Sequence, residues 1–327
     1  MRRYSWLVLT ILFVVAARFA FYAAHSGLGT DFDLLYYAAR HLVGGENPYP
    51  ISSEWYPYPL FYPLPAVFVA IPFTILPVAL ARPVFDICSG ALLAFSLWRF
   101  RGPYALLGML SGAYVLALAW GQSTPLITGA SLVPALGFLL LVKPNQGFAL
   151  FAARPSLAAV IGGLTVLGFS LLVLPSWPLD WWQALHHRNE HLSSLVARPF
   201  GWVLLLAALR WRTPEGRLLL VASLVPQTSL PYELVPLILI PRNAVEMAIF
   251  VLGSWMTCGA FGALVDQYEL AGLVEKAWPL MLLTVYLPML YLVLRRPSNS
   301  VDHGLISIPR EATANGLPAG SNSSGHR

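Results

Sequence analysis

Charged residues are scarce in this chain. Only 11% of its 327 residues are charged, and 57% are hydrophobic, whereas an ordinary soluble domain is about 25% charged. So few charges cannot cover the surface of a soluble protein of this size, and lipid must therefore solvate most of it. The composition excludes a soluble enzyme and predicts an all-α polytopic membrane protein, because a helix satisfies its own backbone hydrogen bonds in lipid.

Cysteine is almost absent as well. Cys88 and Cys258 both lie inside apolar segments, so each is expected to be a small core residue, and neither a disulfide framework nor a metal site is indicated. The net charge of +5 does not form a basic stripe. Basic residues stand singly or in pairs at the ends of apolar runs, which is typical of topology determinants and excludes a nucleic-acid partner.

Long apolar runs are abundant, and a spanning helix needs about 20 such residues. A further apolar stretch, 218–240, is broken by three prolines and is expected to form two short helices that meet near 227–231. Residues 1–297 are thus expected to form a bundle of about ten transmembrane helices in one domain. The continuous runs are 6–24, 83–98, 104–120, 125–142, 157–174, 200–209, 244–264 and 278–294.

The basic residues predict the orientation of this bundle. The first run is expected to be a retained helix rather than a cleaved signal peptide, since no clear small-x-small site follows it. With the N-terminus in the cytoplasm, basic residues outside this run and the tail favour the cytoplasmic side by 12 to 5. Those expected inside are Arg2, Arg3, Arg99, Arg101, Lys143, Arg154, Arg210, Arg212, Arg217, Arg242, Arg295 and Arg296. Those expected outside are Arg40, Arg82, Arg188, Arg198 and Lys276.

The predicted location is therefore the plasma membrane, with both termini cytoplasmic. Loops 25–82 and 175–199 are expected outside the cell. Residues 298–327 are rich in Ser, Gly and Asn and cannot bury a core, so they are expected to be a disordered cytoplasmic tail.

The first outer loop is expected to open with an amphipathic helix. Thr30 fits an N-cap, and Asp31 and Asp33 lie in the first turn, where the helix dipole favours acids. One face is expected to lie flat at the interface and carries Leu34, Tyr37, Ala38, His41 and Leu42. The following apolar stretch, 60–80, holds four prolines and is expected to form interfacial helices rather than a clean span.

An ordered set of motifs runs through the first half of the chain: Asp31-Phe32, Tyr36-Tyr37-Ala38-Ala39, Leu42, Gly44, Pro48-Tyr49, Tyr58-Pro59, Tyr62-Pro63-Leu64-Pro65, Gly121-Gln122 and Lys143-Pro144. This set resembles glycosyltransferase family 87. Members of that family are polyprenyl-phosphate-sugar-dependent enzymes of the GT-C fold. The stretch 122–154 is shorter than the family usually shows, as if a helix pair were compressed.

The resemblance implies an inverting membrane glycosyltransferase. It would move a hexose, most simply mannose, from a polyprenyl phosphate donor to an extracytoplasmic glycan or glycolipid acceptor, without a cofactor or metal. The family's catalytic aspartate matches Asp31, which would take the proton of the acceptor hydroxyl. Helix capping is the alternative role of Asp31, and Asp33, which points to another side, is the alternative base.

Three basic residues are candidates for binding the donor phosphate. Arg18, inside the first span, could bind phosphate or pair with an acid, or it could snorkel to the interface. Arg82 could clamp phosphate through its guanidinium or serve as an interfacial anchor. Lys143 faces the cytoplasm if one helix separates it from Gln122, which is the simpler prediction, and faces the donor if a compressed helix pair does.

Further polar residues are candidates for binding the sugar or the acceptor: Tyr37, Gln122, His186, His187, His191 and Glu233. Gln122 could hydrogen-bond substrate or only form a turn, and Glu233 could support the site or cap a helix. His187 and His191 would share a helix face. Their cluster fits an acceptor or head-group site, an interfacial helix with tryptophan anchors, or, least well, a metal site.

Two other functions are alternatives, and the apolar stretch broken by Pro226, Pro231 and Pro236 fits the first of them. A transporter or flippase of lipid-linked sugars uses broken helices of this kind, and a non-catalytic assembly subunit would keep the fold alone. No paired halves are visible, and the ionisable residues gather at the outer face. This distribution favours surface chemistry over transport.

Overall fold

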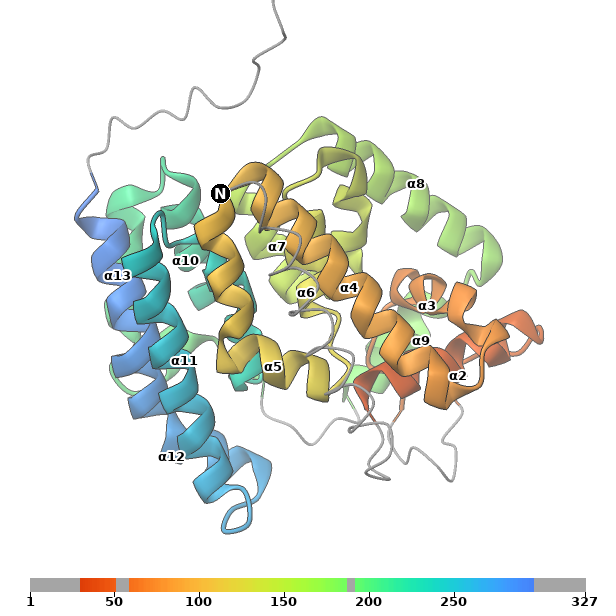
Figure 1. Ribbon diagram of the computed structural model, residues 1–327. Helices are drawn as coiled ribbons and strands as arrows, with labels where there is room; N and C mark the ends of the chain where they lie inside the picture. The colour runs from red at the N-terminus through yellow and green to blue at the C-terminus, as the bar shows by residue number, and fades with distance from the viewer. Residues whose placement is uncertain (1–29, 51–58, 187–191, 297–327) are drawn as a thin grey trace, which may run out of the picture.

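The computed structural model describes residues 30–50, 59–186 and 192–296, and these ranges are helical (Figure 1). The only β pairing among them is an isolated antiparallel bridge between Ser193 and Gln227. The predicted all-α class is thus confirmed for this part of the chain. The expected first span, 6–24, and the expected tail, 298–327, lie outside the described residues.

Three helices are long and apolar enough to cross a membrane. They are α4 (Val78–Phe100), α11 (Ala244–Leu264) and the continuous helix Gly272–Leu294. The last of these combines α12 (Leu270–Met281), the π-helical turn η7 (Leu282–Tyr286) and α13 (Leu287–Leu294). A fourth span is possible where α8 (Leu157–Val173) and α9 (Trp177–His186) join at a bend of 93°.

The other expected spans within the described residues are short or broken, so this part of the chain holds fewer long helices than predicted for it. The run 104–120 divides into η2 (Pro103–Leu110) and α5 (Gly112–Ala119), and 125–142 divides into α6 (Thr124–Ala130) and η3 (Pro134–Val142). A single short helix, η5 (Gly201–Arg210), replaces 200–209. Local chemistry explains two of these breaks. Ser111 caps α5 by accepting the Tyr114 N–H at 3.3 Å, and Pro134 has no N–H to continue a helix.

Other predicted elements are confirmed. Helix α11 has the expected bounds. Residues 60–80 form α3 (Leu64–Ala70) and η1 (Ile71–Ile75) before α4 begins, and 218–240 form α10 (Pro214–Leu224) and η6 (Pro231–Leu239), with the break at 225–230. Two further helices lie in the chain between residues 80 and 218. Helix α7 (Pro144–Ala153) follows Lys143 directly, and η4 (Leu195–Ala197) precedes η5.

Helix α2 (Asp31–Val43) begins as predicted but is more deeply buried than an interfacial helix. Thr30 is its N-cap, and the Asp33 carboxylate accepts the Thr30 backbone N–H at 2.7 Å. Phe32, which is not on the predicted apolar face, stacks its ring on Phe85 of α4 with 4.4 Å between the ring centroids. The Tyr36 hydroxyl donates to the Leu76 carbonyl at 2.6 Å. Helix α2 is therefore packed between α3, η1 and α4, and its acids are held in place.

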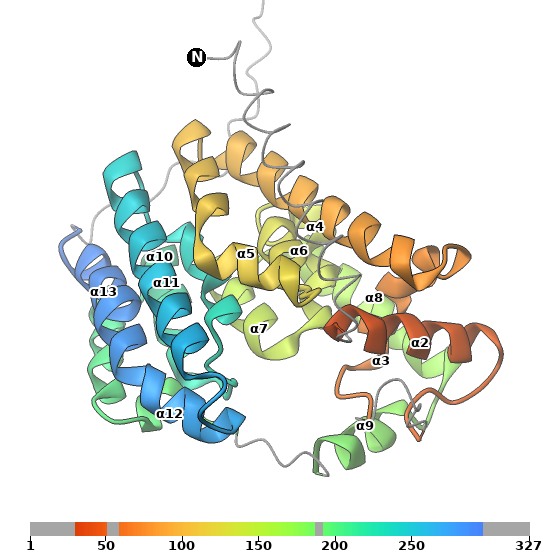
Figure 2. The same ribbon diagram turned by 60° about the horizontal axis from the view of Figure 1, so that its bottom comes forward.

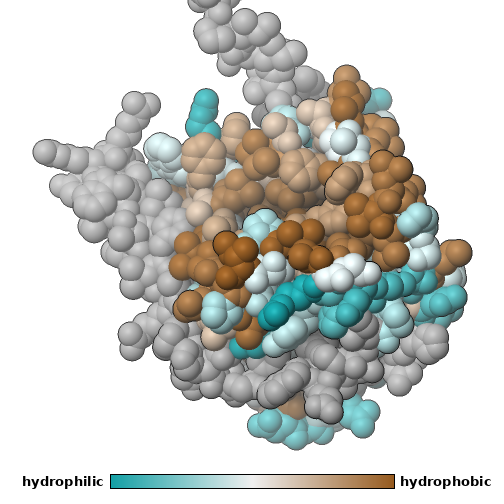
Figure 3. Space-filling model, turned by 90° about the vertical axis from the view of Figure 1, so that its right-hand side faces the viewer, coloured by the Kyte–Doolittle hydropathy of each residue, from teal (hydrophilic) through white to brown (hydrophobic). Residues whose placement is uncertain are grey.

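Helices α11, α12 and α13 lie side by side at one flank of the bundle, and α2, α3 and α9 lie at the other (Figures 1 and 2). On the α8 flank, apolar residues cover a broad band above a hydrophilic zone (Figure 3). Leu164 and Leu172 of α8 are 65% and 82% exposed. Exposed apolar surface of this extent is typical of contact with lipid.

One end of the bundle gathers arginines, and we call it the arginine end. Arg101, after α4, donates to the carbonyls of Leu239 and Pro241 at 2.9 and 2.8 Å. Arg210 donates to the carbonyls of Leu294 and Arg296 at 3.0 and 2.8 Å. Arg101, Arg210 and Arg296 were all predicted to lie on one side of the membrane, and they meet at one end of the structure.

Two buried carboxylates balance part of this positive charge. Arg242 binds Glu215 through two hydrogen bonds of 2.9 and 3.1 Å. Glu246 accepts from Arg295 and, at 2.7 Å, from Arg296. These contacts join α10, α11 and the end of α13.

This cluster predicts an acid-sensitive fold. Burial raises the pKa of Glu215, but the hydrogen bonds and charge of Arg242 and the charge of Arg296 together lower it below its ordinary value of 4.5. A lowered folded-state pKa contributes stability above the unfolded-state value, and this stability is lost as the pH falls through the folded-state value. The unfolding temperature in detergent is therefore expected to fall below about pH 4.5, and to fall less steeply for Glu215→Gln. Equal slopes for the two proteins would contradict this role.

Candidate functional site

The N-terminus of α2 holds the main catalytic candidate. The Asp31 N–H donates to the Trp120 carbonyl at 3.0 Å, which ties the start of α2 to the end of α5. The Asp31 carboxylate oxygen Oδ2 accepts from the Tyr62 hydroxyl at 3.1 Å and from Nε2 of Gln122. The three sequence motifs that contain these residues therefore meet at one carboxylate.

A lysine completes this arrangement. Nζ of Lys143 donates to Oε1 of Gln122 at 2.9 Å, and it lies 4.7 Å from the centroid of the Tyr232 ring. Gln122 is fully buried. Its amide contacts Asp31 through Nε2 and Lys143 through Oε1, so it links the carboxylate to the ammonium. We call the five side chains the Asp31 cluster: Asp31, Tyr62, Gln122, Lys143 and Tyr232.

Gly121 allows Gln122 to approach α2. Its φ of 59° lies in the left-handed region, which glycine adopts at little cost. A Cβ at this position would lie 2.9 Å from Oγ1 of Thr30 and 3.0 Å from Cβ of Phe32. Any larger residue would separate α5 from the start of α2 and move Gln122 away from Asp31.

The position of Lys143 corrects the simpler prediction that one helix separates it from Gln122. Helices α6 and η3 lie between Gln122 and Lys143 and form a short pair, as a compressed helix pair would. The pair brings the chain back to the end of the bundle where Gln122 lies, because Lys143 contacts Gln122. Lys143 therefore lies at the end of the bundle that holds Asp31, and Arg101 lies at the other. Moving Lys143 to the other side makes the predicted excess of basic residues on the cytoplasmic side smaller but does not reverse it.

Asp33 and Arg82 form a separate ion pair. Nε and a terminal nitrogen of Arg82 donate to the two Asp33 oxygens at 2.5 Å each. Asp33 is 2% exposed and Arg82 is 14% exposed. Asp33 thus pairs with Arg82, whereas Asp31 accepts from Tyr62 and Gln122. The predicted phosphate clamp, Arg82, has a buried carboxylate as its partner in place of a phosphate.

Asp86, which lies one turn beyond Arg82 on α4, was not among the predicted site residues. It is 2% exposed, and its Oδ1 has no hydrogen-bond partner among the residues that the structure describes. A carboxyl group inside an apolar helix is a signal that the sequence carries, because such groups are costly in lipid and tend to be functional. Tyr232 was also missed as a partner of Lys143, and only its position within the broken stretch 218–240 hinted at a role.

Helix α9, in the second loop that was predicted to lie outside the cell, reaches the same end of the bundle. Nδ2 of Asn47 donates to Asp180 of α9 at 2.9 Å, and the Trp181 indole N–H donates to the Phe61 carbonyl at 2.8 Å. His186, at the end of α9, is exposed and contacts the Trp182 carbonyl at 2.8 Å. Helix α9 is therefore tied to the first loop through Asn47 and Phe61, and His186 stays a candidate for binding an acceptor or a head group.

The other candidates are spread more widely. Tyr37 packs edge-on against Tyr36 rather than in the Asp31 cluster. Glu233 accepts the Ser229 N–H at 2.7 Å, in the capping role that the sequence allowed. Arg18, His187 and His191 lie outside the described residues.

Glu233 also lines a small cavity with Gln146, Gln227 and Tyr286, of about 10 Å³. Both polar atoms of the Gln146 amide are buried and have no hydrogen-bond partner in the described ranges. A cavity of this size admits a single hydroxyl group or water molecule. Glu233 therefore stays a candidate for substrate binding beside Tyr232.

The Asp31 cluster combines a carboxylate that can accept a proton with an ammonium that can stabilise an anion. Within the described residues, no three His, Cys, Asp or Glu side chains gather in a way that could hold a metal ion. Comparisons of the chain with protein-family models, with curated proteins and with solved structures gave no match.

Proposed function

We propose that the protein is a membrane glycosyltransferase that moves a hexose, most simply mannose, from a polyprenyl phosphate carrier to a glycan or glycolipid. The observation that supports this most is the contact chain from Asp31 through Gln122 to Lys143. Three residues that are distant in sequence, each from a motif resembling glycosyltransferase family 87, come together with chemistry suited to glycosyl transfer.

The proposed reaction is a single displacement. Asp31 accepts the proton of the acceptor hydroxyl while that oxygen attacks the anomeric carbon from the side opposite the phosphate. The bond between the anomeric carbon and the phosphate oxygen breaks, and the polyprenyl phosphate leaves with the electron pair. The Lys143 ammonium stabilises the departing phosphate, taking it as a partner in exchange for Gln122. Attack from the opposite side inverts the anomeric centre.

Lys143→Ala is expected to weaken use of the donor about 10- to 100-fold, because a hydrogen bond to a charged group contributes about 1.5–3 kcal/mol. Lys143→Arg keeps the positive charge and should lose less. The measurement is transfer from a radiolabelled polyprenyl-phosphate sugar, as a function of donor concentration, in membranes. Arg212→Ala, at the arginine end, is the matched control for loss of one charge. Equal donor dependence in Lys143→Ala and the control would remove Lys143 from the site.

We place the reaction outside the cell, at the plasma membrane. The arginines at the end opposite the Asp31 cluster support this orientation, because cytoplasmic ends carry the excess of positive charge. The element η6 connects the two ends, since its second residue is Tyr232 and it is followed by Ile240, whose carbonyl accepts from Arg296 at 2.9 Å.

Cysteine labelling tests this orientation. In a background where Cys88 and Cys258 are replaced by alanine, Glu46→Cys is expected to react with a membrane-impermeant maleimide in intact cells. Arg212→Cys should react only after permeabilisation. Both positions are exposed in the structure, so failure to react reports the side of the membrane. The reverse pattern would place the Asp31 cluster in the cytoplasm.

A transporter or flippase of lipid-linked sugars is the second candidate, because the break between α10 and η6 lies next to the Asp31 cluster. Reconstitution into vesicles separates the two functions. A transferase converts a radiolabelled polyprenyl-phosphate sugar and an acceptor into a glycosylated product. A flippase moves the intact donor across the bilayer without product. A protein that does neither would be an assembly subunit.

A further inference from the structure

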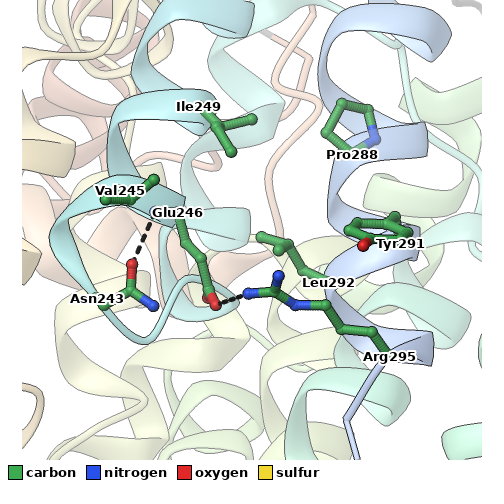
Figure 4. A pocket seen from close by; sticks show the side chains of 8 residues that line it. All are labelled: Asn243, Val245, Glu246, Ile249, Pro288, Tyr291, Leu292 and Arg295. Carbon is green, nitrogen blue, oxygen red and sulfur yellow. Dashed lines mark hydrogen bonds and ion pairs between the residues drawn. The ribbon is translucent and has the colours of Figure 1, made fainter.

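A cavity of about 370 Å³ opens between the start of α11 and the end of α13, at the arginine end (Figure 4). Its lining changes character along the helices. Asn243, Glu246 and Arg295 form a polar end, whereas Ile249 and Pro288 lie at the opposite, apolar end. An amphipathic cavity along two spanning helices has the polarity of a lipid molecule, with a head group at the helix ends and a chain beside the helices.

The cavity also faces the region where lipid must lie. Val245, Ile249 and Tyr291 line it and are 72%, 41% and 62% exposed. These side chains belong to helices that are long and apolar enough to cross a membrane. Exposed apolar groups in such helices contact acyl chains, so an acyl chain fits the apolar end of the cavity better than water does.

The charge of the arginine end favours an anionic head group. Four arginines, namely Arg210, Arg242, Arg295 and Arg296, stand against the two carboxylates of Glu215 and Glu246. The excess is positive, and Arg295 is the member that lines this cavity, where 44% of its side chain is exposed. Its guanidinium also lies 5.6 Å from the centroid of the Tyr291 ring, which orients it along the cavity wall.

A neighbouring cavity of about 200 Å³ shows the same chemistry. It is lined by Arg210, Trp211 and Arg212, so cationic groups again stand beside an exposed aromatic ring. Tryptophan is enriched at the level of lipid head groups. The head-group level at this end of the molecule therefore coincides with the polar end of the larger cavity.

We propose that the cavity between α11 and α13 binds one anionic phospholipid. Its phosphate would lie at Arg295 and one acyl chain along Ile249 and Pro288. Because this site lies at the end opposite the Asp31 cluster, it is separate from any donor site and does not depend on the proposed transferase activity. The bound lipid would bridge the two helices and neutralise positive charge that the carboxylates leave unbalanced.

The test uses the full-length protein, delipidated in detergent and titrated with phosphatidylglycerol or phosphatidylcholine. Bound lipid is counted by native mass spectrometry, and the unfolding temperature is followed in parallel. Phosphatidylglycerol is expected to bind about tenfold or more tightly than phosphatidylcholine, and Arg295→Ala should remove most of that preference. Arg99→Ala, which removes an exposed arginine of α4 that does not line the cavity, should keep it.

Two further variants keep the proposal testable if Arg295→Ala fails to fold, which could happen because Glu246 would lose a partner. Arg295→Lys keeps the charge and is expected to bind phosphatidylglycerol. Ile249→Trp keeps every charge but fills the apolar end, and it is expected to lose binding. Equal binding of the two lipids by the wild type would overturn the proposal. So would unchanged phosphatidylglycerol binding by Ile249→Trp, or an equal loss in the Arg295→Ala and Arg99→Ala variants.

Discussion

Asp31→Asn is expected to reduce sugar transfer about 10²- to 10⁴-fold, the usual contribution of a general base. Asparagine has nearly the same size and is a good residue for the start of a helix, so α2 should form normally. Its amide oxygen can still accept from the Tyr62 hydroxyl. What it cannot do is take the proton of the acceptor. The measurement is transfer from a radiolabelled polyprenyl-phosphate sugar in membranes, with the amount of inserted protein determined in the same samples.

Tyr62→Phe is the matched control, because it removes one hydrogen bond to Asp31 and leaves the carboxylate in place. It is expected to lose far less activity than Asp31→Asn. Near-normal transfer by Asp31→Asn would show that Asp31 serves only to begin α2. Loss of transfer in Asp33→Asn alone, with normal folding, would move the role of base to Asp33.

Arg82→Ala is expected to destabilise the fold by about 3–5 kcal/mol, the usual cost of removing one partner from a buried ion pair. Asp33 would stay almost fully buried with its charge uncompensated. A domain is stable by only about 5–15 kcal/mol, so a loss of this size should lower the unfolding temperature strongly. The measurement is denaturation of the purified protein in detergent.

The double variant Asp33→Asn with Arg82→Gln provides the control. It keeps two polar side chains of similar size without charge, so it should recover much of the stability that Arg82→Ala loses. If Arg82 instead clamps the donor phosphate, Arg82→Ala would fold normally and bind the donor weakly. In that case the double variant would be no better than the single one.

The elements that the sequence predicted well are those whose boundaries are set locally. Helix α11 follows Asn243, whose side chain accepts the Glu246 N–H at 3.0 Å, and no proline interrupts the next 21 residues. Helix α2 likewise starts at a capping residue and ends near Gly44. Apolar periodicity and caps are enough to locate such helices.

The broken spans could not be predicted from hydropathy. The run 104–120 is apolar throughout, and the break at Ser111 depends on a single hydroxyl that caps α5. Likewise, α6 and η3 turn back within 125–142 at the three residues before Pro134, and this one proline hardly lowers the hydropathy of the run. Average apolarity does not register either break, although each changes the end at which later residues lie.

For the same reason the candidate site was predicted only in part. Asp31, Gln122 and Lys143 were identified through motifs, but placing Lys143 beside Gln122 requires knowing that α6 and η3 return the chain. The pairing of Arg82 with Asp33 depends on α4 beginning at Val78, five residues before the predicted start at Pro83. Both contacts are long-range, and no local pattern encodes them.

The ion pairs at the arginine end also have a consequence for biosynthesis. Glu215 and Glu246 are made and inserted well before Arg296, which binds both carboxylates, and before Arg295, which binds Glu246. While the ribosome is still translating the last spanning helix, Glu246 lacks both of these partners near the membrane. Final locking of α10 and α11 must therefore wait for the end of α13. A nascent chain stopped before residue 295 should be an early target for membrane quality control.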